Sequence, residues 1–297
     1  MAKSDGSAII LLIIATFLWA FSFILIKVGL REIPPVTLAA LRFSLASIVF
    51  VVAMFWKYGS QEISIYLKEN WMALLAIGFT GVFLPNVFQN WGMLYTTAYV
   101  SSILQATGPI FTAILAAIFL KESLGTKKGS GAMLALIGAI MISSDGDLRL
   151  LWNLTDYSFG NLLLLGSAIS YGIYTVLSKA RLEEGEPLMV VALSTALGSV
   201  ILVLFLPVVD PLGLIPTFSQ SMWMIVIALA IFPTAIAFFL WFEALKKIEA
   251  SKASFFIFLI PIFTTGLAWL ILNESISLFV ISNAILIILG IGLAGAE

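Results

Sequence analysis

The tetrapeptide PIFT occupies residues 109–112 and recurs at residues 261–264, a separation of 152 residues. The same offset, without any gap, brings further identical residues into register. They are Trp71 and Met72 with Trp223 and Met224, Ala98 with Ala250, Glu122 and Ser123 with Glu274 and Ser275, Gly138 with Gly290, Lys27 with Lys179, and Pro35 with Pro187. Chance supplies single matches, but it does not readily supply a four-residue identity and this series together. The chain is therefore predicted to contain a duplicated unit.

The composition indicates the environment of this unit. The chain has 297 residues, of which 61% are hydrophobic and 10% are charged, and its mean hydropathy is +1.12. A soluble domain carries about a quarter charged residues. Apolar segments of about 20 residues, the length that crosses a bilayer as a helix, recur from one end of the chain to the other. The sequence therefore predicts an all-α membrane protein with many spans.

Charged residues, glycine and proline divide the chain into ten predicted transmembrane helices. Their ranges are 8–30, 36–56, 70–92, 98–120, 128–145, 159–179, 188–206, 221–243, 250–272 and 277–295. The first has an apolar stretch longer than the core of a signal peptide and no clear small-residue cleavage site, so we expect it to be retained. Only the segments 57–69, 145–158 and 207–220 are predicted to be longer than a tight turn.

Each copy of the unit holds five spans, and an odd number means that the second copy enters the membrane from the opposite side. We expect two inverted five-helix repeats, residues 1–145 and 159–297, joined by an extracytoplasmic connection at residues 146–158. Lys and Arg residues agree: only Lys27, Arg31, Arg42 and Arg149 lie outside the predicted cytoplasmic side, which places both termini in the cytoplasm. Inverted repeats are typical of secondary transporters with a substrate site near the midplane.

What the chain lacks excludes several classes of function. It has neither cysteine nor histidine, so disulfides, thiol nucleophiles, histidine bases and imidazole or thiolate metal ligands are excluded, and we expect no cofactor and no metal. Its net charge of −1 gives no reason to expect nucleic acid binding. No Asp or Glu is predicted near the middle of a span, which argues against a proton-coupled antiporter of cationic drugs. Neither an Asp-rich pair nor a glycine-rich phosphate loop supports a membrane enzyme.

Two long segments are similar to a known family. Residues 91–142, which begin WGMLYTTAYV, and residues 241–293, which begin WFEALKKIEA, each carry a small-residue loop, a proline within a helix, a Glu at a helix end and a closing helix with glycine. This pattern resembles the EamA-type drug/metabolite transporters, and WAFSFILIK (19–27) and LAALRFSLA (38–46) resemble that family's first two helices. The resemblance implies ten helices, an inverted repeat and efflux or exchange of small metabolites. The same superfamily includes bacterial exporters of amino acids.

Three side-chain amides, Asn86, Gln89 and Asn90, lie within the apolar third span. Offsets of three and four put them on one helical face. Lipid offers an amide no hydrogen-bond partner, so this face is expected either to line a wet cavity or to bond neighbouring helices. The equivalent positions of the second copy are Phe238, Trp241 and Phe242. One wall is thus predicted to be amide-rich and the other aromatic, which suits a ligand with a polar head and a flat apolar body.

Three other helical faces carry residues of the same kind. They are Ser101, Ser102, Gln105 and Thr112 in the fourth span, Ser167, Ser170, Tyr171, Tyr174 and Ser178 in the sixth, and Thr16, Trp19 and Phe23 in the first. Trp19 corresponds to Tyr171 by the repeat, although aromatic residues of membrane proteins also serve as packing or interface anchors. The predicted substrate-binding residues are Trp19, Phe23, Asn86, Gln89, Asn90, Gln105, Tyr171, Tyr174, Trp241 and Phe242.

Prolines within the spans are candidate hinges. Pro109 and Pro261 are equivalent across the repeat, and each removes a helical hydrogen bond, which predicts either a symmetric pair of hinges or a fixed kink. Pro85 and Pro233 lie in equivalent helices but out of register, so they support a hinge less. The glycine- and alanine-rich stretches 129–139 and 289–296 are predicted to be faces for close helix packing.

Four charged residues are singled out by their positions. Glu243 lies next to Lys246 and Lys247 and is a candidate for a gating ion pair. Arg42 is the charge predicted deepest in a span, where it either attracts an anionic group such as a carboxylate or pairs structurally. Glu122 and Glu274 coincide across the repeat and are expected at the membrane interface.

Together these features predict a secondary transporter that works by alternating access. The predicted substrate is a neutral or zwitterionic metabolite, most plausibly an amino acid with an apolar or aromatic side chain, and the predicted direction is export. A broad drug carrier or a nucleotide-sugar carrier is the alternative within the superfamily, and a channel or scaffold would be distinguished by whether flux saturates. The expected partners are a small-molecule solute and the lipid bilayer. A monomer is sufficient, because both halves of the site lie in one chain.

Overall fold

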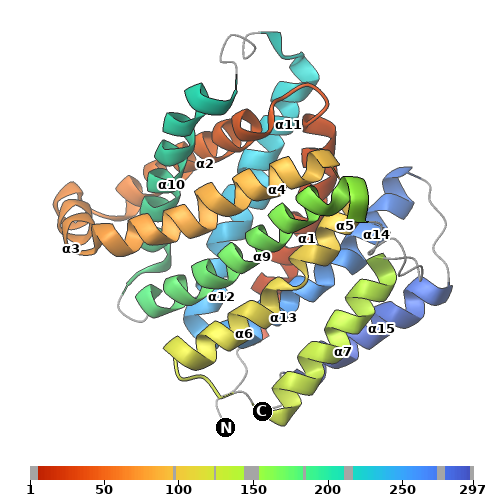
Figure 1. The fold of residues 1–297 in the computed structure, drawn as a ribbon. Helices are drawn as coiled ribbons and strands as arrows, with labels where there is room; N and C mark the ends of the chain where they lie inside the picture. Colours follow the sequence, from red (N-terminus) through yellow and green to blue (C-terminus); the bar gives the residue numbers. More distant parts are fainter. Residues whose placement is uncertain are drawn as a thin grey trace.

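The computed structural model is helical throughout the ranges it describes, with short connections and no strand (Figure 1). These ranges are residues 6–95, 98–123, 125–143, 154–182, 185–210, 217–272 and 278–294. Seven helices are long and apolar enough to cross a membrane, and two shorter apolar helices, Gly108–Phe119 and Ile281–Ala294, accompany them. Large apolar side chains such as Phe119, Val208 and Leu278 are exposed on the outside of the bundle. The chain is a multi-pass membrane protein.

The helices lie in the predicted spans, with differences at the start of the third and sixth spans and within the fourth and ninth. In chain order they are α1 (Gly6–Gly29), α2 (Pro35–Lys57), α3 (Ser60–Gly78), η1 (Phe79–Phe83), α4 (Leu84–Tyr95), α5 (Ala98–Gln105), α6 (Gly108–Phe119), α7 (Thr126–Ser143), α9 (Leu154–Leu182), α10 (Pro187–Val209), α11 (Gln220–Ala230), η3 (Ile231–Ile236), α12 (Ala237–Lys247), α13 (Ala250–Phe255), η4 (Phe256–Phe258), α14 (Leu259–Leu272) and α15 (Leu278–Ala294). The segments η1 and η3 are π-helical, and η4 is a 3-10 turn. Arg149, Glu274 and residues 146–153 of the predicted connection lie outside the described residues.

The loop predicted at residues 57–69 is wrong, because α3 begins at Ser60 and its helix continues through η1 and α4 to Tyr95. Its first turns are amphipathic: Ile63 is buried, whereas Gln61 and Glu62 are exposed. Glu62 also sits in the first turn, where a negative charge is favourable. The charges there mark the end of the apolar stretch, and the helix extends beyond it.

The fourth and ninth predicted spans are interrupted. The break between α5 and α6 falls at residues 106–107, and Pro109 occupies the first turn of α6, where no helical N–H is needed. In the other copy α13 passes through the η4 turn into α14, and Pro261 lies in the first turn of α14. Pro109 and Pro261 therefore start a new helical segment rather than kink a continuous helix.

The 152-residue offset recurs in the contacts of the folded chain. The π-helical segments η1 and η3 begin at equivalent residues, Phe79 and Ile231. Lys27 Nζ donates to the Met93 carbonyl at 2.7 Å, and the equivalent Lys179 Nζ donates to the equivalent Leu245 carbonyl at 2.9 Å. The same local arrangement is thus built twice.

Helices of the first half pack on helices of the second. The pairs in contact are α1 with α12, α4 with α9, α2 with α10, and α7 with α15. Figure 1 shows α7 and α15 side by side at one edge of the bundle. Glycine makes this approach possible, because a Cβ added at Gly138 would lie 2.8 Å from the Asn283 carbonyl and one at Gly131 would lie 2.5 Å from the Gly290 carbonyl. The small-residue stretches are packing faces.

Candidate functional site

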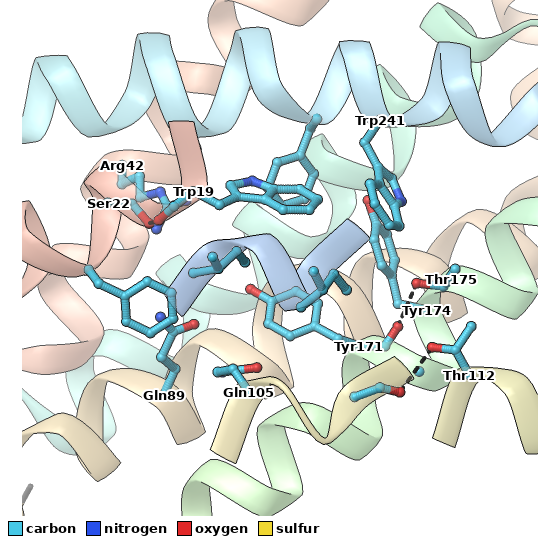
Figure 2. Close-up of a pocket in the computed structure, with 16 residues that line it drawn as sticks. Trp19, Ser22, Arg42, Gln89, Gln105, Thr112, Tyr171, Tyr174, Thr175 and Trp241 are labelled. Carbon is cyan, nitrogen blue, oxygen red and sulfur yellow. Dashed lines mark hydrogen bonds between the residues drawn. The ribbon is translucent and has the colours of Figure 1, made fainter. Parts of the chain in front are cut away.

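A pocket lies among α1, α2, α4, α9 and α12 and the broken helices α5/α6 and α13/η4/α14 (Figure 2). It holds about 680 Å³ of space free of atoms, including the part open to the outside. Its lining residues are Trp19, Ser22, Phe23, Arg42, Gln89, Gln105, Gly108, Thr112, Tyr171, Gly172, Tyr174, Thr175, Phe238, Trp241, Ile257 and Ile260. Both halves of the chain contribute to this lining.

The wall itself follows the internal repeat. Six pairs of lining residues are separated by the repeat offset: Trp19 with Tyr171, Ser22 with Tyr174, Phe23 with Thr175, Gln89 with Trp241, Gln105 with Ile257, and Gly108 with Ile260. Only Arg42, Thr112, Gly172 and Phe238 lack their equivalent in the wall. The position of the pocket is therefore shared by the two copies, whereas the side chains that each copy presents differ.

The π-helical segment η3 organises one side of the pocket. Pro233 has no N–H, so it cannot bond the Leu229 carbonyl one turn earlier. The Thr234 hydroxyl donates to that carbonyl instead, at 2.7 Å, and accepts a hydrogen bond from Arg42 Nε. The Pro233 carbonyl accepts a hydrogen bond from Trp19 Nε1 at 3.0 Å. The π-helical segment η3, with Pro233 in it, thus holds two side chains of the first half, Arg42 and Trp19, in place by hydrogen bonds.

Arg42 is a buried cation, exposed to only 5% of its surface. Its guanidinium lies 4.9 Å from the centre of the Phe43 ring. Among the described residues, Arg42 forms no ion pair with Asp or Glu, and no lining residue is acidic. A charge inside a membrane protein normally pairs or faces a wet cavity, so Arg42 is chemically the most unusual residue of the wall.

Aromatic rings form much of the remaining surface. Trp19 packs against Trp241 at 5.0 Å between ring centres and against Phe238 at 5.7 Å, and Tyr174 lies 6.1 Å from Phe238. Trp241 Nε1 is buried and has no hydrogen-bond partner among the described residues. Figure 2 shows Arg42 and Gln89 toward one side of the pocket and Trp241 and Tyr174 toward the other. The pocket has a polar, cationic side and an aromatic side.

The three amides of the third span have different surroundings. Gln89 lines the pocket. Asn86 instead donates to the Val82 carbonyl at 2.9 Å and to the Gly81 carbonyl, which Pro85 cannot bond, at 3.5 Å. Asn90 donates to the Pro35 carbonyl at 2.9 Å and ties α4 to the start of α2. Asn86 and Asn90 hold the frame around the wall that Gln89 forms.

A hydrogen-bonded chain supports Gln105. Gln105 Nε2 donates to the Ser167 hydroxyl, which donates to the Pro85 carbonyl, each at 2.9 Å. Phe242 lies outside the wall and packs its ring 5.8 Å from that of Tyr174. Gly81 permits the position of Tyr174, since a Cβ there would lie 2.0 Å from the ring.

The predicted hinge and gate residues occupy other places. Pro109 follows the lining residue Gly108, and Pro261 follows Ile260. Lys246 pairs with Glu186 at 3.2 Å and Lys247 donates to the Ser7 hydroxyl, and within the described part of the chain neither bonds Glu243. The Glu122 carboxylate accepts the Ala250 and Ser251 N–H groups at 2.7 and 3.1 Å and caps α13.

The structure brings together most of the predicted substrate-binding residues and adds several more. Trp19, Phe23, Gln89, Gln105, Tyr171, Tyr174 and Trp241 line the pocket, and so does Arg42. Residues of the wall that were not predicted are Ser22, Gly108, Gly172, Thr175, Ile257 and Ile260. Extending the repeat register to each predicted residue would have found three of them, because Phe23, Tyr174 and Gln105 have Thr175, Ser22 and Ile257 as their equivalents.

The model of the EamA-like transporter family matches residues 6–144 and 158–296. An "Uncharacterized transporter" of Archaeoglobus fulgidus is 31% identical over 97% of each chain, and a "Probable terminal-alkyne amino-acid exporter" of Streptantibioticus cattleyicolor is 25% identical over 91% of this chain and 86% of its own. One crystal structure, 20% identical in sequence, superposes with a TM-score of 0.80 over 98% of this chain and 96% of that one.

Proposed function

This chain belongs to the EamA-like transporter family, and we propose that it exports an amino acid with an apolar or aromatic side chain across the cytoplasmic membrane by alternating access. The observation that carries the proposal is the composition of the pocket wall, in which six pairs of residues are repeat equivalents. A site between two copies of one unit is what alternation requires, because each copy then closes the same site from one side.

The architecture proposed for this mechanism is ten transmembrane helices in two inverted five-helix repeats, residues 1–145 and 159–297, joined at residues 146–158, of which 154–158 are the first residues of α9. Two repeat-equivalent serines support a two-fold axis between the halves: Ser47 Oγ donates to Ser199 Oγ at 3.1 Å where α2 packs on α10. Equivalent residues meet each other only where such an axis passes. The close approaches of Gly138 to Asn283 and of Gly131 to Gly290 agree with such an axis, because the repeat equivalents of Gly138 and Asn283 are Gly290 and Gly131.

The proposed orientation places both termini in the cytoplasm. Ends of helices predicted to be cytoplasmic are in contact with one another: Glu186 pairs with Lys57 at 3.8 Å and with Lys246, and Glu249 pairs with Lys128 and Lys252. The start of α1 joins this cluster through Ser7 and Lys247. A concentration of basic residues at one end of the bundle is the usual sign of the cytoplasmic side.

Movement is proposed to occur at the interrupted helices. Residues 106–107 between α5 and α6 correspond to residues 258–259, next to the η4 turn (Phe256–Phe258) between α13 and α14, and both breaks lie beside the pocket. Short non-α segments of this kind absorb changes of backbone angle, so Pro109 and Pro261 are proposed as paired hinges. The substrate is proposed to contact Trp19, Phe23, Gln89, Gln105, Tyr171, Tyr174 and Trp241, with Asn86, Asn90 and Phe242 behind them.

The amino-acid part of the proposal rests on two observations. The pocket has a cationic side and an aromatic side, which suits a solute with a charged head and an apolar body. A relative named as a probable amino-acid exporter is similar along most of the chain.

Transport by reconstituted protein tests this function. Proteoliposomes are loaded with labelled amino acids, and we expect apolar or aromatic ones to leave faster than from protein-free vesicles, with a rate that saturates. Trp241→Ala is expected to abolish most of this flux, whereas Trp56→Ala, which changes a tryptophan 89% exposed on the outside, is expected to leave it unchanged. Flux of a nucleotide sugar or an organic cation, with no flux of any amino acid, would overturn the substrate class.

A further inference from the structure

We propose that Arg42 binds the carboxylate of the transported solute, and that the pocket selects its substrate by this carboxylate and not by an ammonium group. The inference deepens the proposed function and rests on it. Its consequence is that the substrate class is wider than amino acids: a 2-oxo acid or another monocarboxylate with an apolar or aromatic body fits the same site.

The first support is the charge of the pocket. Arg42 is 5% exposed, lines the cavity and forms no ion pair with the described Asp and Glu residues. Taking a guanidinium out of water is costly unless an opposite charge compensates it. Among the lining residues none is acidic, so the described wall offers no such charge of its own. A carboxylate on the solute supplies the missing charge at the moment of binding.

The second support is the hydrogen bonding of the guanidinium. It carries five N–H bonds in a fixed planar fork. In the described part of the chain only Nε–H is donated to a side chain, the Thr234 hydroxyl. That hydroxyl gives its own hydrogen to the Leu229 carbonyl at 2.7 Å, so its lone pair is held toward Arg42. One edge of the guanidinium is therefore anchored, and the terminal N–H groups are left for the bidentate contact that a carboxylate accepts.

The third support is the asymmetry between the copies. The repeat equivalent of Arg42 is Ser194, whose hydroxyl bonds the Val190 carbonyl of its own helix, and the equivalent of Thr234 is Val82. Six pairs of lining residues obey the repeat, whereas Arg42 is one of the four that do not. A contact needed only to assemble two copies of one scaffold would be expected twice. The single arginine is instead a feature of one wall of the pocket.

An ammonium group finds no comparable partner. The aromatic rings of the wall can attract a cation, but the ammonium of an amino acid lies on the carbon next to the carboxylate. When that carboxylate contacts Arg42, the ammonium is held close to the guanidinium and is repelled by it. Removing the ammonium is therefore expected to leave binding unchanged or to strengthen it, whereas removing the carboxylate is expected to weaken it.

The test compares matched probes that differ in one group. The detergent-purified full chain is titrated with phenylalanine, phenylpyruvate, phenylalaninamide and phenethylamine, and with the corresponding leucine series, while its melting temperature is followed. We expect the acids and 2-oxo acids to stabilise the protein, and the amides and amines to need at least about tenfold higher concentration, the 1.4 kcal/mol of a modest charge-assisted contact. Equal effects of acid and amide in both series, or no effect of any acid, would overturn the inference.

Variants assign the selectivity to Arg42. In Arg42→Gln the preference for acid over amide is expected to disappear, and in Arg42→Lys it is expected to persist in part. Arg31 is exposed and lies outside the pocket, so Arg31→Gln is expected to keep the full preference. A preference that survives in folded Arg42→Gln contradicts the assignment. If Arg42→Gln does not fold, the wild-type comparison of acid with amide still decides. Amino-acid flux without any preference for acid over amide would leave the proposed function standing and overturn this inference alone. An Arg42-dependent preference for acids without amino-acid flux would support this inference and overturn amino-acid export.

Discussion

Replacing Thr234 by valine removes a hydroxyl on which two buried groups depend. Thr234 is fully buried, donates to the Leu229 carbonyl at 2.7 Å and accepts from Arg42 Nε. Pro233 has no N–H to offer the Leu229 carbonyl, so in the variant that carbonyl loses the hydroxyl donor that takes its place. The guanidinium loses its one hydrogen bond to a described side chain at the same time. Thr234→Val therefore tests whether η3 holds the cationic side of the pocket.

The magnitude follows from the two losses. An unpaired buried carbonyl costs about 1–3 kcal/mol, and a hydrogen bond to a charged group contributes about 1.5–3 kcal/mol. Because valine keeps the shape of threonine and both losses occur at one side chain, we expect about 3 kcal/mol rather than the full sum.

Thr16→Val is the matched control. Thr16 is also fully buried, but its hydroxyl bonds the Leu12 and Ile13 carbonyls of its own helix at 2.8 and 3.0 Å. Removing it leaves the helical N–H donors of those carbonyls in place, so we expect a loss below about 1 kcal/mol. The free energy of unfolding of both variants is measured in mixed detergent micelles, together with the preference for acid over amide. Equal stability of the two variants, with that preference unchanged, would refute the role of Thr234.

Three further changes probe other parts of the molecule. Gly138→Leu is expected to remove most folded protein from a size-exclusion profile, because the added Cβ would lie 2.8 Å from the Asn283 carbonyl. Gly129→Leu is the control, since a Cβ at Gly129 has nothing within 4 Å, and it should have no effect. Equal profiles of the two variants would contradict the close packing of α7 on α15. Gln89→Ala is expected to lower the transport rate at unchanged folded yield, and a wild-type rate would remove Gln89 from the site; the exposed Gln61→Ala is the control. Lys27→Met and Lys179→Met each remove a cation that bonds a carbonyl near a helix end. Each change is expected to make a thiol placed at residue 22 more reactive from the membrane face on which the replaced lysine lies. Identical effects of both changes from one face would contradict the inverted arrangement.

The helical plan could be predicted from the sequence because the bilayer imposes it. Apolar length and charge locate most span ends within a few residues, the start of α3 excepted, and the same offset that aligns PIFT also aligns the π-helical segments and the lysine contacts. The errors have physical causes. The charges at 57–69 predict the end of a helix, although an amphipathic helix continues past the apolar stretch. Pro109 and Pro261 were expected inside continuous helices, although proline fits best in the first turn of a new one.

The site could be predicted in part. Helical spacing placed Asn86, Gln89 and Asn90 on one face, but it cannot tell which amide faces a cavity and which bonds a backbone carbonyl freed by proline. Pro85 and Pro233 lie in equivalent helices but out of register, so they supported a hinge less than Pro109 and Pro261 did. Each nevertheless precedes a polar residue, Asn86 or Thr234, that reaches the carbonyl five residues back. That compensation depends on three-dimensional placement of the backbone, and the link between Thr234 and Arg42 depends on the packing of α2 against η3.

The central claim is that one pocket opens alternately to the two faces of the membrane, and a single thiol tests it most directly. The chain has no cysteine, so Ser22→Cys places the only thiol in the pocket wall. Ser47→Cys, buried at the contact of α2 with α10 and outside the wall, is the control. Labelling with a membrane-impermeant maleimide is measured in right-side-out and inside-out vesicles. We predict that Cys at position 22 reacts in both and Cys at position 47 in neither; reaction at position 22 from one face only would contradict alternating access.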